Sequence, residues 1–353
     1  MKISKTTIEW LLETDNPPVR YLTMKNLLVY PDSKLKTVRK NINSYKAIKG
    51  ILKHHQTFWG KDPHLYRKYK GGYWNLIFLG DMFADGRDPL IKNGIEFVLN
   101  DNKWQDFLHK GDTHWICLPS NILRAMSTLG YADDSRVLDL IERAAKVVIA
   151  NNGIKCAVMN YSMHPYCIMA IPKALMMFGT YAGNKRIVKQ AIKLLSEQLL
   201  KRKIFRYVPD NNDEWVKHYE RIQKQHRASR SSLPKQQIVM KEELAKIRPG
   251  LWKKTKSFNP KPGWLKFGYP LHYNSDVLES MRSLLDAGVK DDKRMNDALD
   301  VIQQAAEPDG RWKMKFSLNG KMWIDIEKRG QPSKWITYHA LRVMNNYRQI
   351  SIV

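Results

Sequence analysis

The sequence predicts an all-α protein of about five to six helical hairpins, forming a single domain over residues 1–353. Four stretches share one layout: an apolar helical run, a glycine at a corner and a second, amphipathic run. Three of the corner glycines, Gly80, Gly130 and Gly179, are 50 and 49 residues apart. The first helix of each pair is apolar almost all round and the second has one apolar stripe, which predicts an inner and an outer layer.

The elements can be placed in order along the chain. Asn16 caps a first helix that begins at Pro17, a position that suits proline, and a basic helix follows it. The four repeats then begin at Tyr73, Asn121, Cys167 and Asp276, and a last inner helix covers about 332–347. The spacing is compatible with a closed ring or with an open solenoid.

Two segments depart from the repeat. Residues 205–262 are polar, basic and irregular, which indicates an insertion of loop and short helix that interrupts the domain. Further on, apolar and polar residues alternate on both sides of Asn319-Gly320, a strong turn signal. This pattern predicts a small β-hairpin near the C-terminus.

Charge and cysteine content limit the possible binding partners and the cellular location of the protein. The net charge is +26, and residues 34–70 and 201–262 carry most of it, with 11 and 17 Lys or Arg against 1 and 6 Asp or Glu. Such segments either bind polyanions, acidic proteins or anionic membranes, or form an ordinary solvated surface. Three cysteines argue against a disulfide framework. Without a signal peptide or a long apolar run, we expect a cytoplasmic protein with no transmembrane segment.

Three stretches carry a resemblance to a known family: "YWNLIFLGDMFADGRDP", "PGWLKFGYPLHYNSDVLESMRSLLDAGVKDDKRMNDALDVI" and "DGRWKMKFSLNGKMWIDIEKRGQPSKWITYHALRVM". Together they resemble uncharacterised prokaryotic proteins related to squalene cyclases, terpenoid cyclases and protein prenyltransferases. The resemblance implies an α/α toroid whose central cavity binds an apolar or prenylated molecule. The Asp-x-Asp-Asp signature of class II terpenoid cyclases is not present, so acid-initiated cyclisation is not expected.

The resemblance also implies a candidate zinc site. Cys117, Cys156 and Cys167 fall where the relatives carry cysteines, and His114 or His164 would complete a structural Zn²⁺ set. Cys117 and Cys167 are one period apart, which places them at the starts of adjacent inner helices, at the same end. Buried cysteines that only pack are an equal alternative, and a nucleophilic cysteine is a third.

Other candidates lie at the predicted starts of inner helices. Asp276 is either a cavity-facing acid, base or ligand, or a helix cap. His339 is interpreted as a core histidine. Five aromatic residues are candidates for lining a ligand cavity, with core packing as the alternative: Tyr73, Trp74, Tyr269, Tyr273 and Trp335.

Two functions follow from these observations. The first is a toroid that binds an apolar or prenylated ligand, as a binding protein or as an enzyme. The second is a noncatalytic helical scaffold that binds an acidic protein, nucleic acid or an anionic membrane through the two basic segments.

Overall fold

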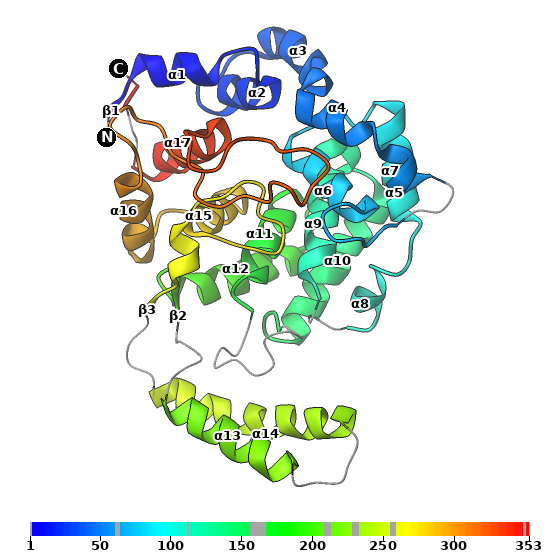
Figure 1. The fold of residues 1–353 in the computed structure, drawn as a ribbon, viewed down its shortest axis with the longest axis vertical. Helices are drawn as coiled ribbons and strands as arrows, with labels where there is room; N and C mark the ends of the chain where they lie inside the picture. Colours follow the sequence, from blue (N-terminus) through cyan, green and yellow to red (C-terminus); the bar gives the residue numbers. More distant parts are fainter. Residues whose placement is uncertain are drawn as a thin grey trace.

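The structure is a computed structural model that describes residues 2–60, 64–111, 113, 115–155, 167–207, 213–227, 233–254, 259–348 and 351–352, and it is mostly helical (Figure 1). The α-helices are α1 (Lys5–Leu11), α2 (Pro17–Asn26), α3 (Asp32–Lys40), α4 (Lys46–Leu52), α5 (His55–Trp59), α6 (Gly72–Asp81), α7 (Pro89–Leu99), α8 (Asp106–His109), α9 (Cys117–Met126), α10 (Ser135–Ala150), α11 (Ala170–Gly179), α12 (Arg186–Leu200), α13 (Asp213–Arg227), α14 (Leu233–Lys254), α15 (Val277–Asp286), α16 (Asn296–Gln304) and α17 (Lys334–Arg348).

Short elements connect these helices. The strands are β1 (Lys2–Ile3), β2 (Arg206–Tyr207), β3 (Asn259–Pro260) and β4 (Ser351–Ile352), and the remaining helical turns are η1 (Ile42–Ser44), η2 (Ser127–Tyr131), η3 (Pro262–Leu265) and η4 (Lys293–Met295). Strands β1 and β4 pair in parallel and so join the two ends of the chain. Strands β2 and β3 pair antiparallel.

Five helix pairs and one single helix form most of the body of the molecule, and α1, α4, α5 and α8 pack against them. The pairs are α2 with α3, α6 with α7, α9 with α10, α11 with α12, and α15 with α16, and α17 follows them. The first helices of the pairs also contact one another in succession, from α6 through α9, α11, α15 and α17 to α2. We call α2, α6, α9, α11, α15 and α17 the central helices.

Burial separates the two kinds of helix as the hydrophobic pattern predicts. Every residue of α6 is buried, whereas α10 buries one stripe that includes Val137, Ile141 and Val148 and exposes the opposite face. An apolar surface on all sides requires cover on all sides, while one stripe requires a single neighbour. The central helices therefore form the inside of the body.

The repeated glycines serve two different purposes. Gly130 and Gly288 have φ of +106° and +72°, as expected at a left-handed corner. Gly80 and Gly179 instead lie within α6 and α11, where a Cβ would stand 2.6 Å from the Cα of Ala125 and 2.2 Å from the carbonyl oxygen of Asp286. The expectation of a left-handed corner is wrong for these two, which permit close approach of neighbouring central helices.

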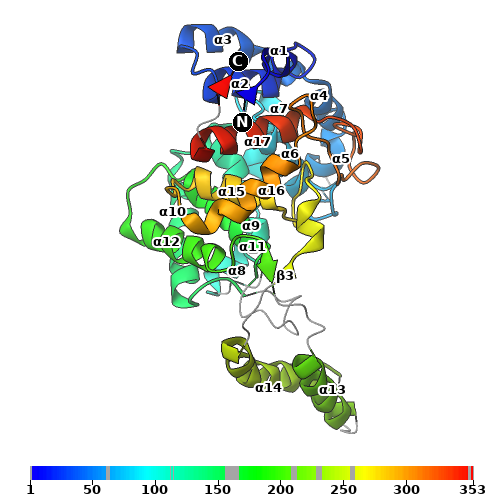
Figure 2. The same cartoon turned by 90° about the vertical axis from the view of Figure 1, so that its left-hand side faces the viewer.

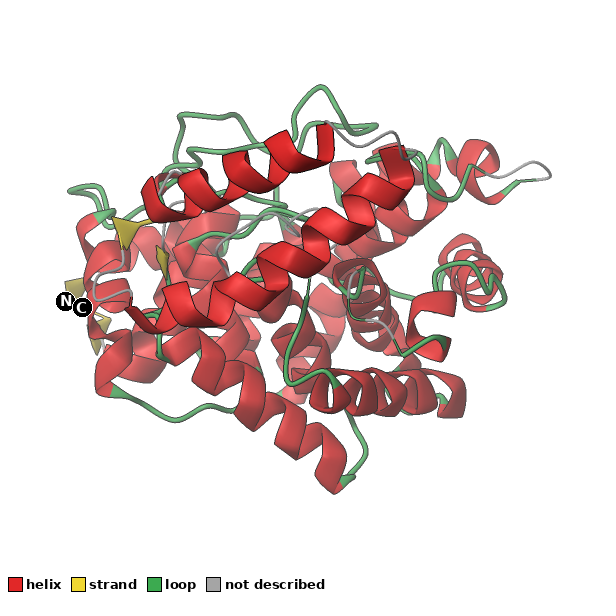
Figure 3. Cartoon of the chain, turned by 90° about the horizontal axis from the view of Figure 1, so that it is seen from below, coloured by secondary structure: helices red, strands yellow, loops and turns green. Residues whose placement is uncertain are grey.

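The insertion differs from the expected loop and short helix. The described residues between β2 and β3 form two long helices, α13 and α14, which pack on each other and lie apart from the central helices (Figures 1 and 2). Viewed from below, the two helices cross the near face (Figure 3). Apolar residues recur at helical spacing along both helices, which allows them to pack on each other. They form a small core that is separate from the main one: Trp215, Ile222, Met240, Leu244 and Leu251.

The β-hairpin predicted around Asn319-Gly320 is wrong. The turn is present, with φ of +75° at Gly320, but the residues beside it form no strand. The two sides of this segment meet in an isolated antiparallel bridge between Lys313 and Pro332, and the backbone N–H groups of Lys315 and Phe316 donate to the carbonyl of Phe267 instead. The small antiparallel sheet of the molecule is β2–β3, at the base of the insertion.

Candidate functional site

A cavity of about 590 Å³ lies among the central helices, within the range typical of small-molecule sites. Each central helix, or the turn directly after it, contributes to its wall. The lining residues are Tyr21, Leu22, Lys25, Asn26, Arg39, Phe83, Arg124, Thr128, Met176, Gly179, Thr180, Arg282, Leu285, Asp286, Tyr338, His339 and Arg342. Lys25 and Gly179 are exposed to solvent, so the cavity opens on the side where the central helices α2, α6, α9, α11 and α15 end.

Positive charge dominates this wall. Lys25, Arg39, Arg124, Arg282 and Arg342 line the cavity, and Asp286 is the one carboxylate among the lining residues. The C-terminal ends of helices carry partial negative charge, which compensates part of this excess. The remainder makes the cavity a favourable place for an anion.

Arg124 and Asp81 form a buried ion pair behind the wall. The Arg124 Nη2 atom lies 2.5 Å from Asp81 Oδ1, and both side chains are less than a tenth exposed. Burial alone would raise the pKa of Asp81, but the Arg124 guanidinium, with Arg282, holds it below its usual value. The Nε atom of Arg124 is buried without a hydrogen-bond partner.

Arg282, Asp286 and Arg342 connect α15 to α17. Arg342 Nη1 donates to Asp286 Oδ1 at 2.5 Å, and Arg282 Nε lies 3.7 Å from Asp286 Oδ2. Arg282 Nη1 also lies 2.9 Å from His339 Nε2. Since a guanidinium only donates, Nε2 accepts this bond, and the proton of the neutral imidazole is on Nδ1.

The surroundings of His339 keep its imidazole neutral. Burial, followed by the positive charges of Arg282, Arg342 and Arg124, lowers its pKa well below the usual value. Its Nδ1 atom is buried and has no hydrogen-bond partner. His339 is buried as the sequence predicts, and it also lines the cavity.

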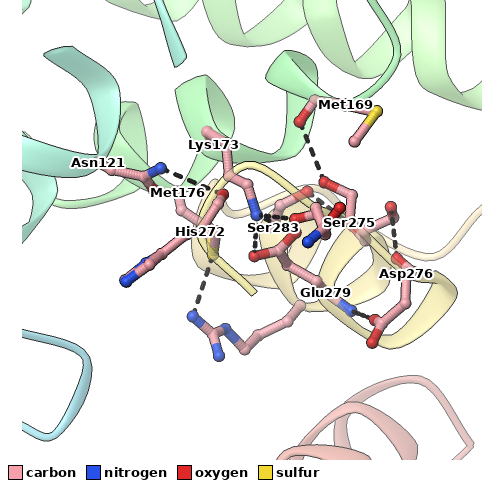
Figure 4. A network of polar contacts seen from close by, with 12 residues as sticks. Asn121, Met169, Lys173, Met176, His272, Ser275, Asp276, Glu279 and Ser283 are labelled. Carbon is pink, nitrogen blue, oxygen red and sulfur yellow. Dashed lines mark hydrogen bonds and ion pairs between the residues drawn. The ribbon is translucent and has the colours of Figure 1, made fainter. Parts of the chain in front are cut away.

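A second polar network lies beneath this wall (Figure 4). Lys173 of α11 is fully buried, and its Nζ contacts both carboxylate oxygens of Glu279 on α15 and donates to the carbonyl of Asn274 at 2.6 Å. Burial lowers the pKa of Lys173, and the Glu279 carboxylate opposes this effect. The network fastens α11 to α15.

Asp276 caps α15, which is the second of its two predicted roles. Its Oδ1 accepts from the N–H of Glu279 at 2.7 Å and its Oδ2 accepts from the N–H of Gly268 at 2.9 Å. Burial, with the nearby Glu279 charge, raises its pKa to about 7. The carboxyl borders a chamber of about 20 Å³ shared with Arg282 and His339. Asp276 is not among the residues that line the larger cavity.

The five predicted aromatic residues are buried or half-buried, and four of them form two contacting pairs. Trp74 packs edge-on against Tyr273, and Tyr269 stacks on Trp335 with ring centroids 4.3 Å apart. The Tyr73 hydroxyl donates to Asp101. None of the five lines the 590 Å³ cavity, although Tyr269 borders the small chamber. Their role in ligand binding remains a prediction.

The candidate metal ligands are described only in part. Cys117 begins α9, and Cys167 precedes α11 by three residues, so the two lie near the starts of adjacent central helices as predicted. Cys156, His114 and His164 lie outside the described residues. Within the described part of the chain, no group of three His, Cys, Asp or Glu side chains is arranged to hold a metal. The zinc site remains a prediction.

Sequence reasoning missed the basic residues of the cavity. Arg124, Arg282 and Arg342 stand on central helices, and a charged residue at a position that the helical pattern marks as inward-facing is the signal that would have found them. The net charge drew attention to the two basic segments instead. Of those segments, Arg39 alone reaches the cavity wall.

Comparisons with protein-family models, curated proteins and solved structures find no match to this chain. Among the described helices, none has both the length and the apolar character that crossing a bilayer requires.

Proposed function

We propose that this protein is an α/α toroid whose central cavity binds a small organic anion. The observation that carries the proposal is the set of five cationic side chains, from α2, α3, α9, α15 and α17, around one cavity of about 590 Å³. The succession of contacts among the central helices supports the toroid, as does the contribution of every central helix to one cavity wall.

The charge balance favours a ligand with a negative group. With Asp81 counted as the partner of Arg124, five cations face two carboxylates, Asp81 and Asp286, around this cavity. Guanidinium groups bind planar carboxylates and phosphates through paired hydrogen bonds.

The wall also contains an apolar part for the body of the ligand. Leu22, Phe83, Met176 and Leu285 lie between the cationic groups. A ligand that joins a phosphate or carboxylate group to an apolar chain satisfies both surfaces. The apolar or prenylated ligand that the family resemblance implies is consistent with this proposal if it carries such an anionic group.

Calorimetric titration with inorganic diphosphate and with octyl phosphate tests the proposal. We expect both to bind, and octyl phosphate to bind more tightly than inorganic phosphate, titrated alongside, because its chain contacts the apolar wall. In R342Q, affinity should fall at least tenfold, since about 1.5–3 kcal/mol belongs to a charge-assisted hydrogen bond. The matched control is R348Q on the same helix, where Arg348 pairs with the exposed Asp300 outside the cavity.

Two results would overturn the proposal. The first is the absence of binding by the unmodified protein. The second is equal loss of affinity in R342Q and R348Q, which would mean that anions bind the surface through general charge. If the cavity arginines only compensate the helix ends, R342Q will lower stability and no anion will bind the cavity.

The scaffold function remains the alternative, because α13 and α14 stand apart from the body and belong to the basic segment 201–262. Polyanion binding of that kind weakens steeply with added salt. Binding inside a partly enclosed cavity is screened less. The salt dependence of diphosphate binding therefore separates the two functions.

A further inference from the structure

Asp286 is the one acidic residue in the wall of the cavity, and its position is unusual for a carboxylate. It is the last residue of α15, where the partial negative charge of a helix end disfavours an acidic side chain. The side chain is 23% exposed. Stabilisation of α15 therefore does not explain its presence, and its partners must.

Those partners are two of the proposed anion-binding groups. Arg342 donates to Asp286 at 2.5 Å, and Arg282 lies 3.7 Å away. Without the carboxylate, two guanidinium groups from α15 and α17 would face the same cavity with no negative charge between them. Asp286 supplies that charge in the unliganded protein.

An anion bound in the cavity by Arg282 and Arg342 lies close to Asp286, because Asp286 contacts both guanidinium groups and lines the same cavity. The carboxylate then repels the ligand, and the repulsion increases with the ligand's charge.

We propose that Asp286 sets the charge selectivity of the cavity by competing, as a built-in anion, for Arg282 and Arg342. This inference rests on the proposed function. It makes Asp286 a specificity-determining residue that disfavours highly charged ligands relative to singly charged ones. A carboxylate that merely holds the two arginines in place would act in the opposite direction, because its removal would weaken binding of every anion.

The test compares D286N with the unmodified protein by calorimetry, using inorganic diphosphate and hexanoate as probes. We expect D286N to bind diphosphate about tenfold more tightly or better, and to gain clearly less for the singly charged hexanoate. The thermal unfolding midpoint without ligand should fall, while the rise on adding diphosphate should grow. D300N, which removes a carboxylate from the Arg348 pair outside the cavity, should change neither affinity.

Weaker binding of both probes by D286N, or an equal gain for both, would overturn the inference and leave the proposed function intact. Failure of the unmodified protein to bind either probe would overturn the proposed function as well. D286E keeps the negative charge and serves as the second variant. It should retain the charge preference of the unmodified protein, and a D286E that behaves like D286N would also overturn the inference.

Discussion

Substitution of Lys173 by methionine tests the buried connection between α11 and α15 beneath the cavity. Methionine retains most of the apolar volume of the lysine stem and removes the ammonium group. The Glu279 carboxylate, whose side chain is 9% exposed, then has no ammonium beside it. Breaking a buried ion pair on one side costs about 3–5 kcal/mol.

The structure places the expected loss near the lower end of that range. The Glu279 charge also acts on the buried Arg124 guanidinium, which compensates part of the lost attraction. The carbonyl of Asn274 loses its 2.6 Å hydrogen bond as well, at a further cost of about 1 kcal/mol. We therefore expect K173M to lower the free energy of unfolding by about 4 kcal/mol.

Urea unfolding followed by tryptophan fluorescence measures this loss, provided that the transition is reversible. The double variant K173M/E279Q removes the uncompensated charge and should recover about half of the lost stability. K189M is the matched control, because Lys189 is an exposed residue of α12 whose Nζ donates to Asn184 at 2.6 Å. Its cost should stay below about 0.5 kcal/mol.

Two results would refute this reasoning. A K173M protein that loses less than about 1 kcal/mol would show that Glu279 is not held in a buried, desolvated pair. A double variant less stable than K173M alone would show that the Glu279 carboxylate stabilises the fold independently of Lys173. Either result would remove the proposed connection between α11 and α15.

Three further predictions follow from the same structure. The folded state binds the Asp276 proton up to pH about 7, so the stability from this carboxyl is complete below its unfolded pKa and is lost as the pH rises through about 7. The destabilisation by D276N should therefore shrink by about 3 kcal/mol between pH 5 and pH 8. A constant difference in urea unfolding would contradict the raised pKa. Residues 208–258 can be replaced by Asn-Gly, a turn that suits the β2–β3 pair. This change should leave the unfolding midpoint of the body and diphosphate binding unchanged. A lower midpoint or a loss of diphosphate binding would show that the insertion belongs to the body or to the site. G179A should lower the free energy of unfolding by about 1–3 kcal/mol through overpacking against the Asp286 carbonyl. The control G250A lies on α14, where a Cβ meets no atom within 4 Å, and should be neutral or stabilising. Equal effects of the two in thermal unfolding would contradict the close approach of α11 and α15.

The helical repeat was predictable because local physics determines it. The hydrophobic pattern distinguishes the fully buried α6 from the one-sided α10, and the contacts follow that distinction. Strands β2 and β3 bracket α13 and α14 within the segment 205–262, whose assignment as an insertion into one domain remains a prediction. Two left-handed corner glycines, Gly130 and Gly288, were also predictable from their position after an apolar run.

Contacts between residues distant in sequence explain the features that the sequence did not reveal. The residues around Asn319-Gly320 have a hairpin pattern, but neighbouring N–H groups find the carbonyl of Phe267, which is distant in sequence. Gly179 looks like a corner residue, and only the position of α15 shows why a side chain is not accommodated there. The spacing of residues along the chain does not predict which distant segments pack against each other.

The cavity was the harder part to predict for the same reason. An arginine at an inward-facing helix position can be noticed in one sequence, but its role depends on which other helices bring charges to the same place. Arg124, Arg282 and Arg342 come from α9, α15 and α17 and meet only in the folded chain. The sequence predicted Asp276 as a site residue or a cap, and the hydrogen bonds to Glu279 and Gly268 favour the cap.

The most direct measurement is a crystal structure of the protein with tungstate, whose anomalous signal locates a bound anion. We predict an anomalous peak in the central cavity, within hydrogen-bond distance of Arg282 and Arg342. Peaks confined to α13, α14 or the outer surface, with none in the cavity, would contradict it.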